Sequence, residues 1–470
     1  MKKVIAILIF VFVFTNIYSQ LKWDKVVAGT EFSVALRSDG TLWAWGANNY
    51  GQLGIGNKDN RFSAVQVGED TDWVDVDAGA FYVLAIKKDS SLWGWGHNAV
   101  GELGINEGTE FNEPVKLNDD DWLKIACGQG HSLALKADSS LWAWGFNPAG
   151  QIGDSTKDNK FEPVLISDQE WIDVTAGGYH SMAIKADSSL WGWGGNYVGQ
   201  LGDSLGSLVL TPVLIDSVSK WKKISTGFEF TIGIKADNSL WSWGFNANNQ
   251  LGNGNKNTVF KPTRIGQGEK WKFISAGSSY AFAISEGGAL YAWGFNAYGQ
   301  LATGNTTQLD TVTRIGDDST WIYICGATGA YGNNLVYGMH TLGIKEGGSF
   351  ICGAGANYIG QVGIGHESIK VVDFDCDIEV IDGVDEIQLD DALACSVFPN
   401  PATDYVNIEI FDDSEKGNKI QIFDLKGEML YSEVKKDNDF RVDISKLNKG
   451  FYIITISNGM RKYRSKLIVE

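Results

Sequence analysis

The chain has 470 residues, 44% of them hydrophobic and 20% charged, with 57 glycines and only 7 prolines. This composition is typical of a folded, turn-rich protein of two or three domains and not of a disordered chain. The formal net charge is −18, and nucleic acid is excluded as a partner because binding to phosphates needs a basic surface.

The N-terminus has the pattern of a secretory signal peptide. Two lysines precede an apolar run from Val4 to Phe14, and a polar end follows. This run is too short to span a bilayer comfortably, and no other run is long enough. We therefore expect residues 1–19 to be removed by cleavage between Ser19 and Gln20, which leaves no transmembrane segment in the mature chain. An uncleaved N-terminal anchor is the alternative.

One short pattern recurs along the chain. LWAWGANNYGQLG begins at residue 42, and related stretches begin at residues 92, 141, 190, 240 and 290, at intervals of 49 or 50 residues. A seventh, degraded copy begins at residue 351, after an insertion at 326–338. Each unit also opens with a tryptophan, and all 18 tryptophans of the chain occupy repeated positions. A tryptophan that returns in every unit is explained most simply by packing, and not by a ligand site.

Each unit has the pattern of four short strands. In the unit that begins at residue 171, WIDVTAG, SMAIK and LWGWG are the first three strands, and PVLI at 163–166 shows the fourth in the preceding unit. Four of these last strands are expected to begin with a proline: Pro114, Pro163, Pro212 and Pro262. Proline suits an outer edge strand, where a missing N–H breaks no ladder. Seven units of four strands predict an all-β fold, a seven-bladed β-propeller.

The order of the motifs resembles the regulator of chromosome condensation repeat. The pattern is W-x-x-[IV]-x-x-G, then [HFY]-S-x-A-[LI]-K, then L-W-x-W-G-x-N-x-x-G-Q-L-G. The resemblance implies a propeller over residues 20–374, in which the stretch 369–374 completes the last blade. Nuclear members of this family are exchange factors for a small GTPase, and plant members are ultraviolet receptors with a G-W-R-H-T stretch. An exported, acidic chain without that stretch fits neither role, whereas secreted bacterial propellers of this repeat bind proteins.

An acidic linker and a small C-terminal domain follow the propeller. Residues 367–395 hold ten Asp or Glu and one Lys, so we assign 375–395 as a solvated linker. Asp373, Asp375 and Asp377 alternate, but they lack the Gly and distal Glu of an EF-hand loop, and we expect no metal. Residues 396–470 are short alternating strands joined by KG, NKG and NG turns, which predict a small β-sandwich.

This C-terminal domain resembles the type A sorting domain of the type IX secretion system. The matching residues are Pro399, Asn400, Pro401, Ala402, Lys426, Gly427, Gly450, Phe451, Tyr452 and the terminal Lys466-Leu467-Ile468-Val469, whereas Glu470 departs from the usual basic ending. The resemblance implies the type IX machinery as a partner. It also implies a location outside the cell or on the outer surface of a two-membrane bacterium.

The chain carries no signature of catalysis or of a cofactor. One repeat slot holds histidine in three units and an aromatic residue in the others: His131, His180 and His340 against Phe32, Tyr82, Phe230 and Tyr280. A slot that accepts phenylalanine does not require a titrating imidazole, and His97 and His366 stand singly in or near loops. We expect no enzyme, although the many carboxylates leave a glycosidase-like pair as an alternative.

Five cysteines cannot all pair within one chain. Cys127 and Cys325 are placed in a slot that holds alanine in other units, so we expect them to be small core residues. Cys376 and Cys395 flank the acidic linker, and they either pair with each other or stay free.

The expected function is recognition by loops that vary between blades on a common frame. Candidate residues before the second strands are Glu31, Phe81, Gln129, Tyr179, Phe228 and Glu229, and those after the WGxN pattern are Tyr50, Tyr197 and Tyr298. Blade seven has Cys352 and Ala354 in place of tryptophan, and its insertion carries Tyr331 and Tyr337, so it is either a relaxed closure point or a ligand notch. The ligand is expected to be a protein, with a glycan as the alternative. Ordinary packing is the alternative explanation for all of these residues.

Overall fold

The computed structural model of the chain describes residues 21–118, 120–203, 206–329, 331–332, 335–336, 338–365, 368–376, 395–398, 402–410, 418–423, 429–437, 439–458 and 461–469. The predicted signal peptide and its predicted cleavage site at Ser19 and Gln20 lie outside these ranges. The chain divides into two compact units, Met1–Asp382 and Gly383–Glu470. Within the described ranges, no helix is long and apolar enough to cross a membrane.

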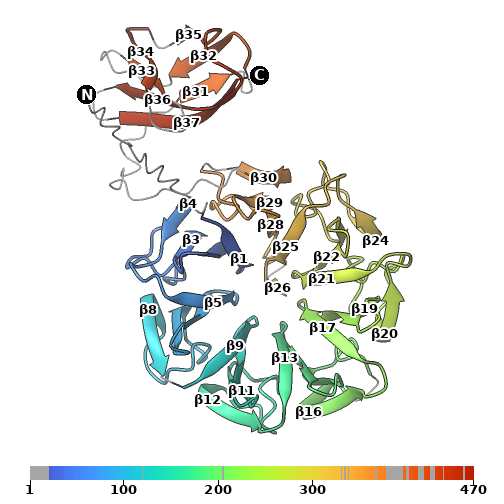
Figure 1. Cartoon of the computed structure of the whole chain (residues 1–470). Helices are drawn as coiled ribbons and strands as arrows, with labels where there is room; N and C mark the ends of the chain where they lie inside the picture. Colours follow the sequence, from blue (N-terminus) through green and yellow to red (C-terminus); the bar gives the residue numbers. More distant parts are fainter. Residues whose placement is uncertain are drawn as a thin grey trace, which may run out of the picture. The chain divides into compact units, whose positions relative to one another are not determined.

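The first unit consists of seven antiparallel sheets of four strands around a central axis (Figure 1). The first strands, nearest the axis, are β1 (Trp23–Ala28), β5 (Trp73–Ala78), β9 (Trp122–Cys127), β13 (Trp171–Ala176), β17 (Trp221–Thr226), β21 (Trp271–Ala276) and β25 (Trp321–Gly326). The second strands are β2 (Phe32–Arg37), β6 (Tyr82–Lys87), β10 (His131–Lys136), β14 (His180–Lys185), β18 (Phe230–Lys235), β22 (Tyr280–Ser285) and β28 (His340–Lys345).

The outer half of each sheet contains the third and fourth strands. The third strands are β3 (Leu42–Gly46), β7 (Leu92–His97), β11 (Leu141–Gly145), β15 (Leu190–Gly195), β19 (Leu240–Gly244), β23 (Leu290–Gly294) and β29 (Ile351–Asn357). The fourth strands are β4 (Arg61–Gln66), β8 (Glu110–Asn118), β12 (Lys160–Ser167), β16 (Leu208–Asp216), β20 (Val259–Ile265), β24 (Leu309–Arg314) and β30 (Ser368–Asp375). The prediction of a seven-bladed propeller is confirmed, and β30 supplies the last strand of blade seven as expected.

Antiparallel pairing gives the propeller two distinct faces. The turns between first and second strands and the loops after the third strands lie on one face, which we name the turn face. The first strands begin on the opposite face, which we name the start face. The loops that carry the candidate recognition residues therefore all belong to the turn face.

The tryptophans pack the blades against one another. In blade four the Trp171 ring lies edge-on to Trp191, with centroids 5.8 Å apart, and the Lys185 ammonium lies 3.7 Å from the Trp191 ring centroid. Trp193 is fully buried, and its Nε1 donates to the Gln151 carbonyl of the preceding blade at 2.8 Å. Aromatic edge contacts and cation–π contacts of this kind stabilise a core beyond simple area burial. The repeated tryptophans are thus structural.

The position of the prolines corrects the sequence prediction. Pro114, Pro163, Pro212 and Pro262 lie inside β8, β12, β16 and β20, and not at their starts. In blade three the β11–β12 register shifts between Ala143 and Gly145, and Pro163 lies in the stretch of β12 opposite that shift. At such an irregularity the missing N–H of proline does not remove a regular hydrogen bond between the strands. The fourth strands are edge strands, as predicted.

Blade seven compensates in two ways for the first of its two missing tryptophans. Cys352, in the tryptophan slot of β29, forms a disulfide with Cys376 just beyond β30. Phe374 of β30 stacks on Trp321 with ring centroids 4.6 Å apart. Both alternatives given for Cys376, a bond to Cys395 and a free thiol, are therefore wrong. Cys395 lies in the second unit, in β31 (Cys395–Phe398).

Only one of the two cysteines predicted at the alanine position of the first strand lies there. Cys127 is the last residue of β9 and is buried there, as alanine is in other blades. The placement of Cys325 in this slot is wrong, because Gly326 occupies it and pairs with Thr341. Cys325 lies one residue earlier, is half-buried and packs against a core cluster at the junction of blades seven and one.

The ring closes without any exchange of strands between blades one and seven. Contacts across the junction come from side chains and turns. The Ser33 Oγ lies 2.9 Å from the His340 Nε2, and the Trp45 Nε1 donates to the Gln361 carbonyl at 3.0 Å. These contacts repeat those between the other blades, so the closure is continuous with the rest of the ring.

Removing the disulfide with Cys352→Ala and Cys376→Ala is expected to lower the free energy of unfolding by about 3 kcal/mol, because the bond closes a loop of 24 residues. Urea unfolding of the oxidised chain and the variant measures the difference. Cys127→Ala, which restores the alanine of other blades, is the matched control and is expected to change stability by less than ~1 kcal/mol. Equal stability of the wild type and the double variant would contradict the prediction.

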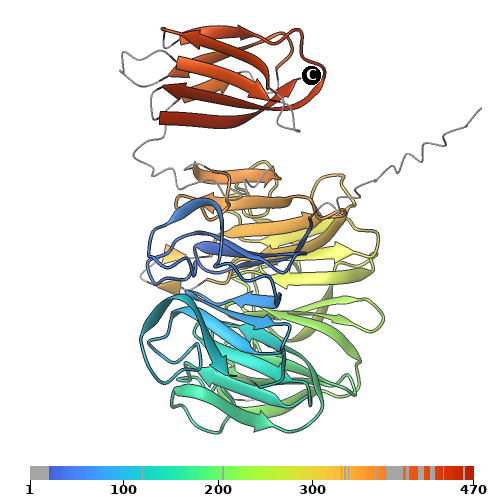
Figure 2. The same cartoon turned by 60° about the vertical axis from the view of Figure 1, so that its left-hand side comes forward.

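The second unit contains two antiparallel sheets. One consists of β31, β32 (Tyr405–Ile410) and β35 (Asp439–Asp443), and the other of β34 (Met429–Lys435), β33 (Asn418–Phe423), β36 (Gly450–Asn458) and β37 (Arg461–Val469) (Figure 2). Both contribute to one core, in which Ile408 and Val442 of the first sheet join Ile422 and Ile454 of the second. This is the predicted small β-sandwich.

Candidate functional site

Buried amides hold the turn-face loops in place. In blade three the Asn147 Oδ1 accepts from the Ile152 N–H and its Nδ2 donates to the Asp158 carbonyl, both at 3.0 Å. The Gln151 Oε1 accepts from the Ala149 N–H at 3.0 Å. In all seven blades the N–H of the leucine, isoleucine or valine after the Gln slot donates to the side-chain oxygen of the asparagine. The loops therefore form a rigid frame on which other residues vary.

Two predicted recognition residues meet at the junction of blades one and two. The Tyr50 ring centroid lies 5.2 Å from that of Phe81 and 5.0 Å from that of His97. Tyr50 is 37% exposed and the other two side chains are half-buried. We name Tyr50, Phe81 and His97 the blade-two cluster.

A second cluster spans blades three to five. The Tyr179 ring centroid lies 6.2 Å from that of Phe146 and 5.6 Å from that of Phe228. Tyr179 and Phe146 are half-buried, and Phe228 is 7% exposed. Phe146 was missed by the sequence reasoning, although it occupies the same slot after the third strand as His97.

The other candidates are dispersed. Tyr197 is 57% exposed on the blade-four loop, and Tyr298 is half-buried on the blade-six loop. The Glu31 carboxylate accepts from the Tyr358 hydroxyl at 2.8 Å, and partial burial raises the pKa of Glu229 above its ordinary value.

The hypothesis of a ligand notch in the blade-seven insertion stays a prediction. Tyr331 lies in the short strand β26 (Tyr331–Gly332), which pairs with β27 (Leu335–Val336). Tyr337 lies outside the described residues.

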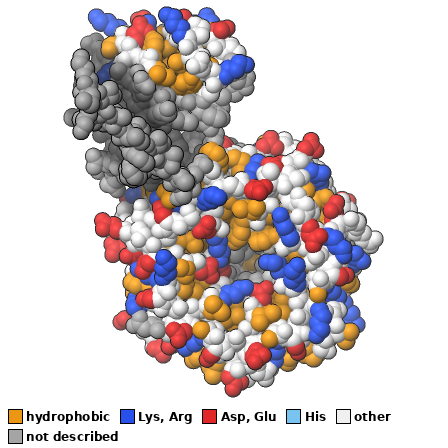
Figure 3. Space-filling model, viewed as in Figure 1, with side chains coloured by type: hydrophobic (Ala, Val, Ile, Leu, Met, Phe, Trp, Pro, Cys, Tyr) orange, Lys and Arg blue, Asp and Glu red, His pale blue; other side chains and the backbone are white. Residues whose placement is uncertain are grey.

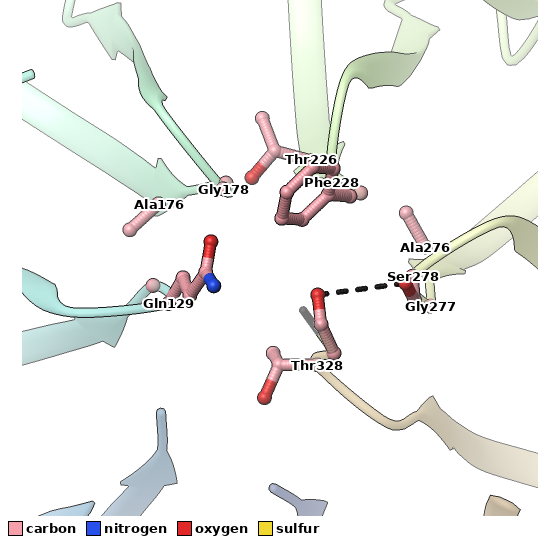
Figure 4. Close-up of a pocket in the computed structure, with 13 residues that line it drawn as sticks. Gln129, Ala176, Gly178, Thr226, Phe228, Ala276, Gly277, Ser278 and Thr328 are labelled. Atoms are coloured by element: carbon pink, nitrogen blue, oxygen red, sulfur yellow. Dashed lines mark hydrogen bonds between the residues drawn. The ribbon is translucent and has the colours of Figure 1, made fainter. Parts of the chain in front are cut away.

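An axial pocket of about 260 Å³, which counts space open to solvent, lies among the turns of blades three to seven (Figure 4). Phe228, Thr226, Thr328 and Gln129 line it, and the buried Gln129 Oε1 has no hydrogen-bond partner. Backbone bonds link these turns around the axis, such as Phe228 N–H to the Ser278 carbonyl at 3.2 Å. The pocket is thus a small recess within a rigid collar, lined mainly by apolar atoms.

Charged pairs line the axis below this recess. The Lys25 ammonium lies 2.8 Å from the Asp75 carboxylate, and Lys124 pairs with Asp173 in the next two blades. At the start face Leu123 and Ile172 are 64% and 51% exposed. Figure 3 shows hydrophobic and basic side chains around the hollow in the middle of one propeller face.

Blade two contains a pair that the sequence reasoning missed. His97 was read as a single loop histidine, but its Nδ1 contacts the Glu102 carboxylate. This hydrogen bond raises the pKa of His97 above its ordinary value. The available signal was Glu102 itself, because the other six blades have glutamine at this position.

The three histidines of the shared slot are all fully buried. Burial lowers the pKa of His131, His180 and His340 to about 3, and each Nε2 lies within 3.1 Å of a serine or threonine hydroxyl of the next blade. They are neutral packing residues at physiological pH. Among the described residues, no three His, Cys, Asp or Glu side chains gather as metal ligands.

The model of the Regulator of chromosome condensation (RCC1) repeat matches residues 39–86, 89–135, 138–184, 187–234 and 237–284. The chain belongs to the RCC1 repeat family. A second model of the same repeat matches residues 23–52, 122–151, 171–200, 221–250 and 271–300. The Secretion system C-terminal sorting domain matches residues 396–470. The chain is therefore an RCC1-type propeller with a sorting domain that indicates export to the cell surface or the extracellular space.

Solved propellers share the fold. Prp20p from Saccharomyces cerevisiae is 18% identical, with a TM-score of 0.64 over 77% of this chain and 89% of that chain. Human WBSCR16 is 21% identical, with a TM-score of 0.60 over 65% of this chain and 85% of that chain. The ulvan lyase NLR42 of Nonlabens ulvanivorans is 33% identical over 76 residues, which are 16% of this chain and 14% of the lyase.

The structure places only some of the sorting-motif residues. Ala402 is buried and bridges to Val469, and the Tyr452 hydroxyl donates to the Asn448 carbonyl at 2.7 Å. Gly450 begins β36, and Lys466 lies in β37. Five residues of the motif lie outside the described residues: Pro399, Asn400, Pro401, Lys426 and Gly427.

Proposed function

We propose that the propeller binds a protein partner through its turn face after export, and that it carries out no catalytic step. The observation that carries this proposal is the grouping of variable-slot aromatic residues into two clusters on a rigid frame. Aromatic side chains provide large contact areas at low entropic cost and are enriched at the centres of protein interfaces. The yeast propeller Prp20p, whose binding to Gsp1p and histones has been described, supports protein binding only by analogy of fold.

Capture from surface and medium extracts tests the proposal, with the mature chain from residue 20 as bait and mass spectrometry as the readout. A turn-face variant, Tyr50→Ser with Tyr179→Ser, is expected to lose more than about tenfold of the captured protein, because both rings are accessible centres of their clusters. The matched control is Leu123→Ser with Ile172→Ser, which removes two exposed apolar side chains from the opposite face.

Three outcomes would contradict the proposal. The start-face variant could lose capture while the turn-face variant keeps it. Capture that free sugars abolish would favour the glycan alternative, in which exposed rings such as Tyr197 stack on the ligand. Turnover of a substrate by the bait would restore the enzyme hypothesis.

A further inference from the structure

Blade two departs from the repeat at two positions together. The slot directly after the third-strand WG holds a histidine only there: Ala47, His97, Phe146, Gly195, Phe245, Phe295 and Ala356. The slot five residues later is glutamine in six blades and glutamate in one: Gln52, Glu102, Gln151, Gln200, Gln250, Gln300 and Gln361. The structure shows that these two departures form a single contact.

Glu102 keeps the structural role of glutamine and adds a charge. Its Oε2 accepts from the Val100 N–H at 3.0 Å, as the Gln151 Oε1 does from Ala149. Its Oε1 faces the Nδ1 of His97. A carboxylate can only accept, so the His97 Nδ1 carries the proton. Because the Glu102 side chain is only 3% exposed against 27% for His97, the buried carboxylate favours the imidazolium form of its partner.

The other side of the imidazole faces the turn-face surface. The Nε2 has no hydrogen-bond partner among the described residues and is not among the buried unsatisfied atoms. The ring lies against Tyr50, which lies in turn against Phe81. The other charged group near His97 is Glu110, opposite it on β8, and its carboxylate pairs with Lys58.

We infer that the blade-two cluster is an anchor for a carboxylate of the protein partner that stands beside an apolar side chain. The His97 Nε2–H donates to the carboxylate, a charge-assisted bond, while the apolar group packs on Tyr50 and Phe81. This inference rests on the proposed function, because it names the partner chemistry on the same face. The chain's charge of −18 repels a generally acidic partner, so the anchor selects one carboxylate and not an acidic surface.

The test uses the mature full chain with ¹⁵N-labelled histidine, whose five imidazoles give a simple spectrum. The probe is N-acetylphenylalanine, which carries a carboxylate beside an aromatic ring, and the matched probe is its neutral amide. We expect saturable shifts of the His97 resonances, with binding of the amide at least about fivefold weaker. Affinity for the acid is expected to fall by a similar factor once the pH exceeds the pKa of His97.

Two variants use residues that the chain itself places in these slots. Glu102→Gln restores the residue of the other six blades, and His97→Phe copies Phe146, so both are expected to fold. We expect both to lose the preference for the acid over the amide, and Glu102→Gln to lower the pKa of His97. Equal binding of the two probes, a preference that survives in His97→Phe, or an unchanged His97 pKa in Glu102→Gln would overturn the inference.

The same variants separate this inference from the proposed function. Partner capture that survives in His97→Phe, with no acid preference in the wild type, removes the carboxylate anchor and leaves turn-face binding intact. Acid preference in the wild type, with capture unaffected by the turn-face variant, shows a carboxylate site at the blade-two cluster that takes no part in partner binding, and it overturns the proposed protein interface.

Discussion

Lowering the pH from 7.5 to 5 is expected to destabilise the propeller by about 6 kcal/mol through three buried histidines, at about 2 kcal/mol each. His131, His180 and His340 have a folded-state pKa of about 3, depressed by burial. Above the ordinary histidine pKa of about 6.5, both folded and unfolded states are neutral and the histidines contribute nothing. Below it these histidines bind protons in the unfolded chain but stay neutral in the folded chain, so stability falls between pH 6.5 and 3.

The hydrogen bonds of His131 show why protonation of these imidazoles is unfavourable in the folded state. The Ser181 hydroxyl donates its single hydrogen to the Gln151 carbonyl at 2.7 Å, so the His131 Nε2–H must donate to the Ser181 Oγ at 3.0 Å. The Nδ1 is then bare, buried and without a partner. A proton there would place a charge in the core with no acceptor, which is the costly case for a buried group.

A matched variant isolates one histidine. His131→Phe with Ser181→Val copies the pair Phe32 and Val83, which pack in one core cluster at the junction of blades one and two. Urea unfolding at pH 7.5 and 5 is expected to show about 2 kcal/mol less pH dependence in this variant than in the wild type. Asp77, whose pKa burial raises to about 6, acts in the opposite direction in both chains and cancels in the comparison. The same pH dependence in both chains would show that His131 does not titrate on unfolding.

The fold was predictable from the sequence because its information is local and repeated. The LWxWG pattern, its alternation and its period fix the strand type, the packing face and the number of blades. The exact register of the strands was harder to predict, because a bulge or a one-residue offset leaves the repeated sequence pattern unchanged. Pro163 was therefore placed at a strand start, and Cys325 was placed in the slot that Gly326 occupies.

The site was less predictable because its contacts join positions that no period relates. Tyr50 and Phe81 were both candidates, but they lie close together only because neighbouring blades pack side by side in the propeller. The His97 contact with Glu102 matches no known motif, and its only trace in the sequence is that both residues differ from those of the other blades. The disulfide of Cys352 likewise depends on where β30 ends beside β29.

Trp193→Ala is expected to lower the free energy of unfolding by about 4 kcal/mol, the usual cost of truncating a fully buried large side chain. The tryptophan fits against a glycine of the preceding blade. A Cβ added at Gly153 would lie 2.8 Å from the Trp193 ring, and Gly153 has a φ of 87°. Gly153→Ala is therefore expected to cost about 3 kcal/mol, part from overlap and part from the positive φ.

The two changes are expected to couple, because each relieves part of the cost of the other. With Trp193 already truncated, Gly153→Ala costs only its backbone part of about 1 kcal/mol, so the double-mutant cycle gives a coupling of about 2 kcal/mol. Urea unfolding of the four chains measures it. Additive costs would show that the overlap is relieved elsewhere.

The chain already contains this double change between blades six and seven. The slot of Gly153 holds Ala302 there, with a φ of 53°, and the slot of Trp193 holds Ala354. Both alanines pack in one core cluster. Ala354→Trp is therefore expected to be tolerated only together with Ala302→Gly, because the indole needs the space that glycine leaves in the other blades. If the single Ala354→Trp variant were as stable as the double variant, steric coupling would not explain why blades six and seven carry alanine at both positions.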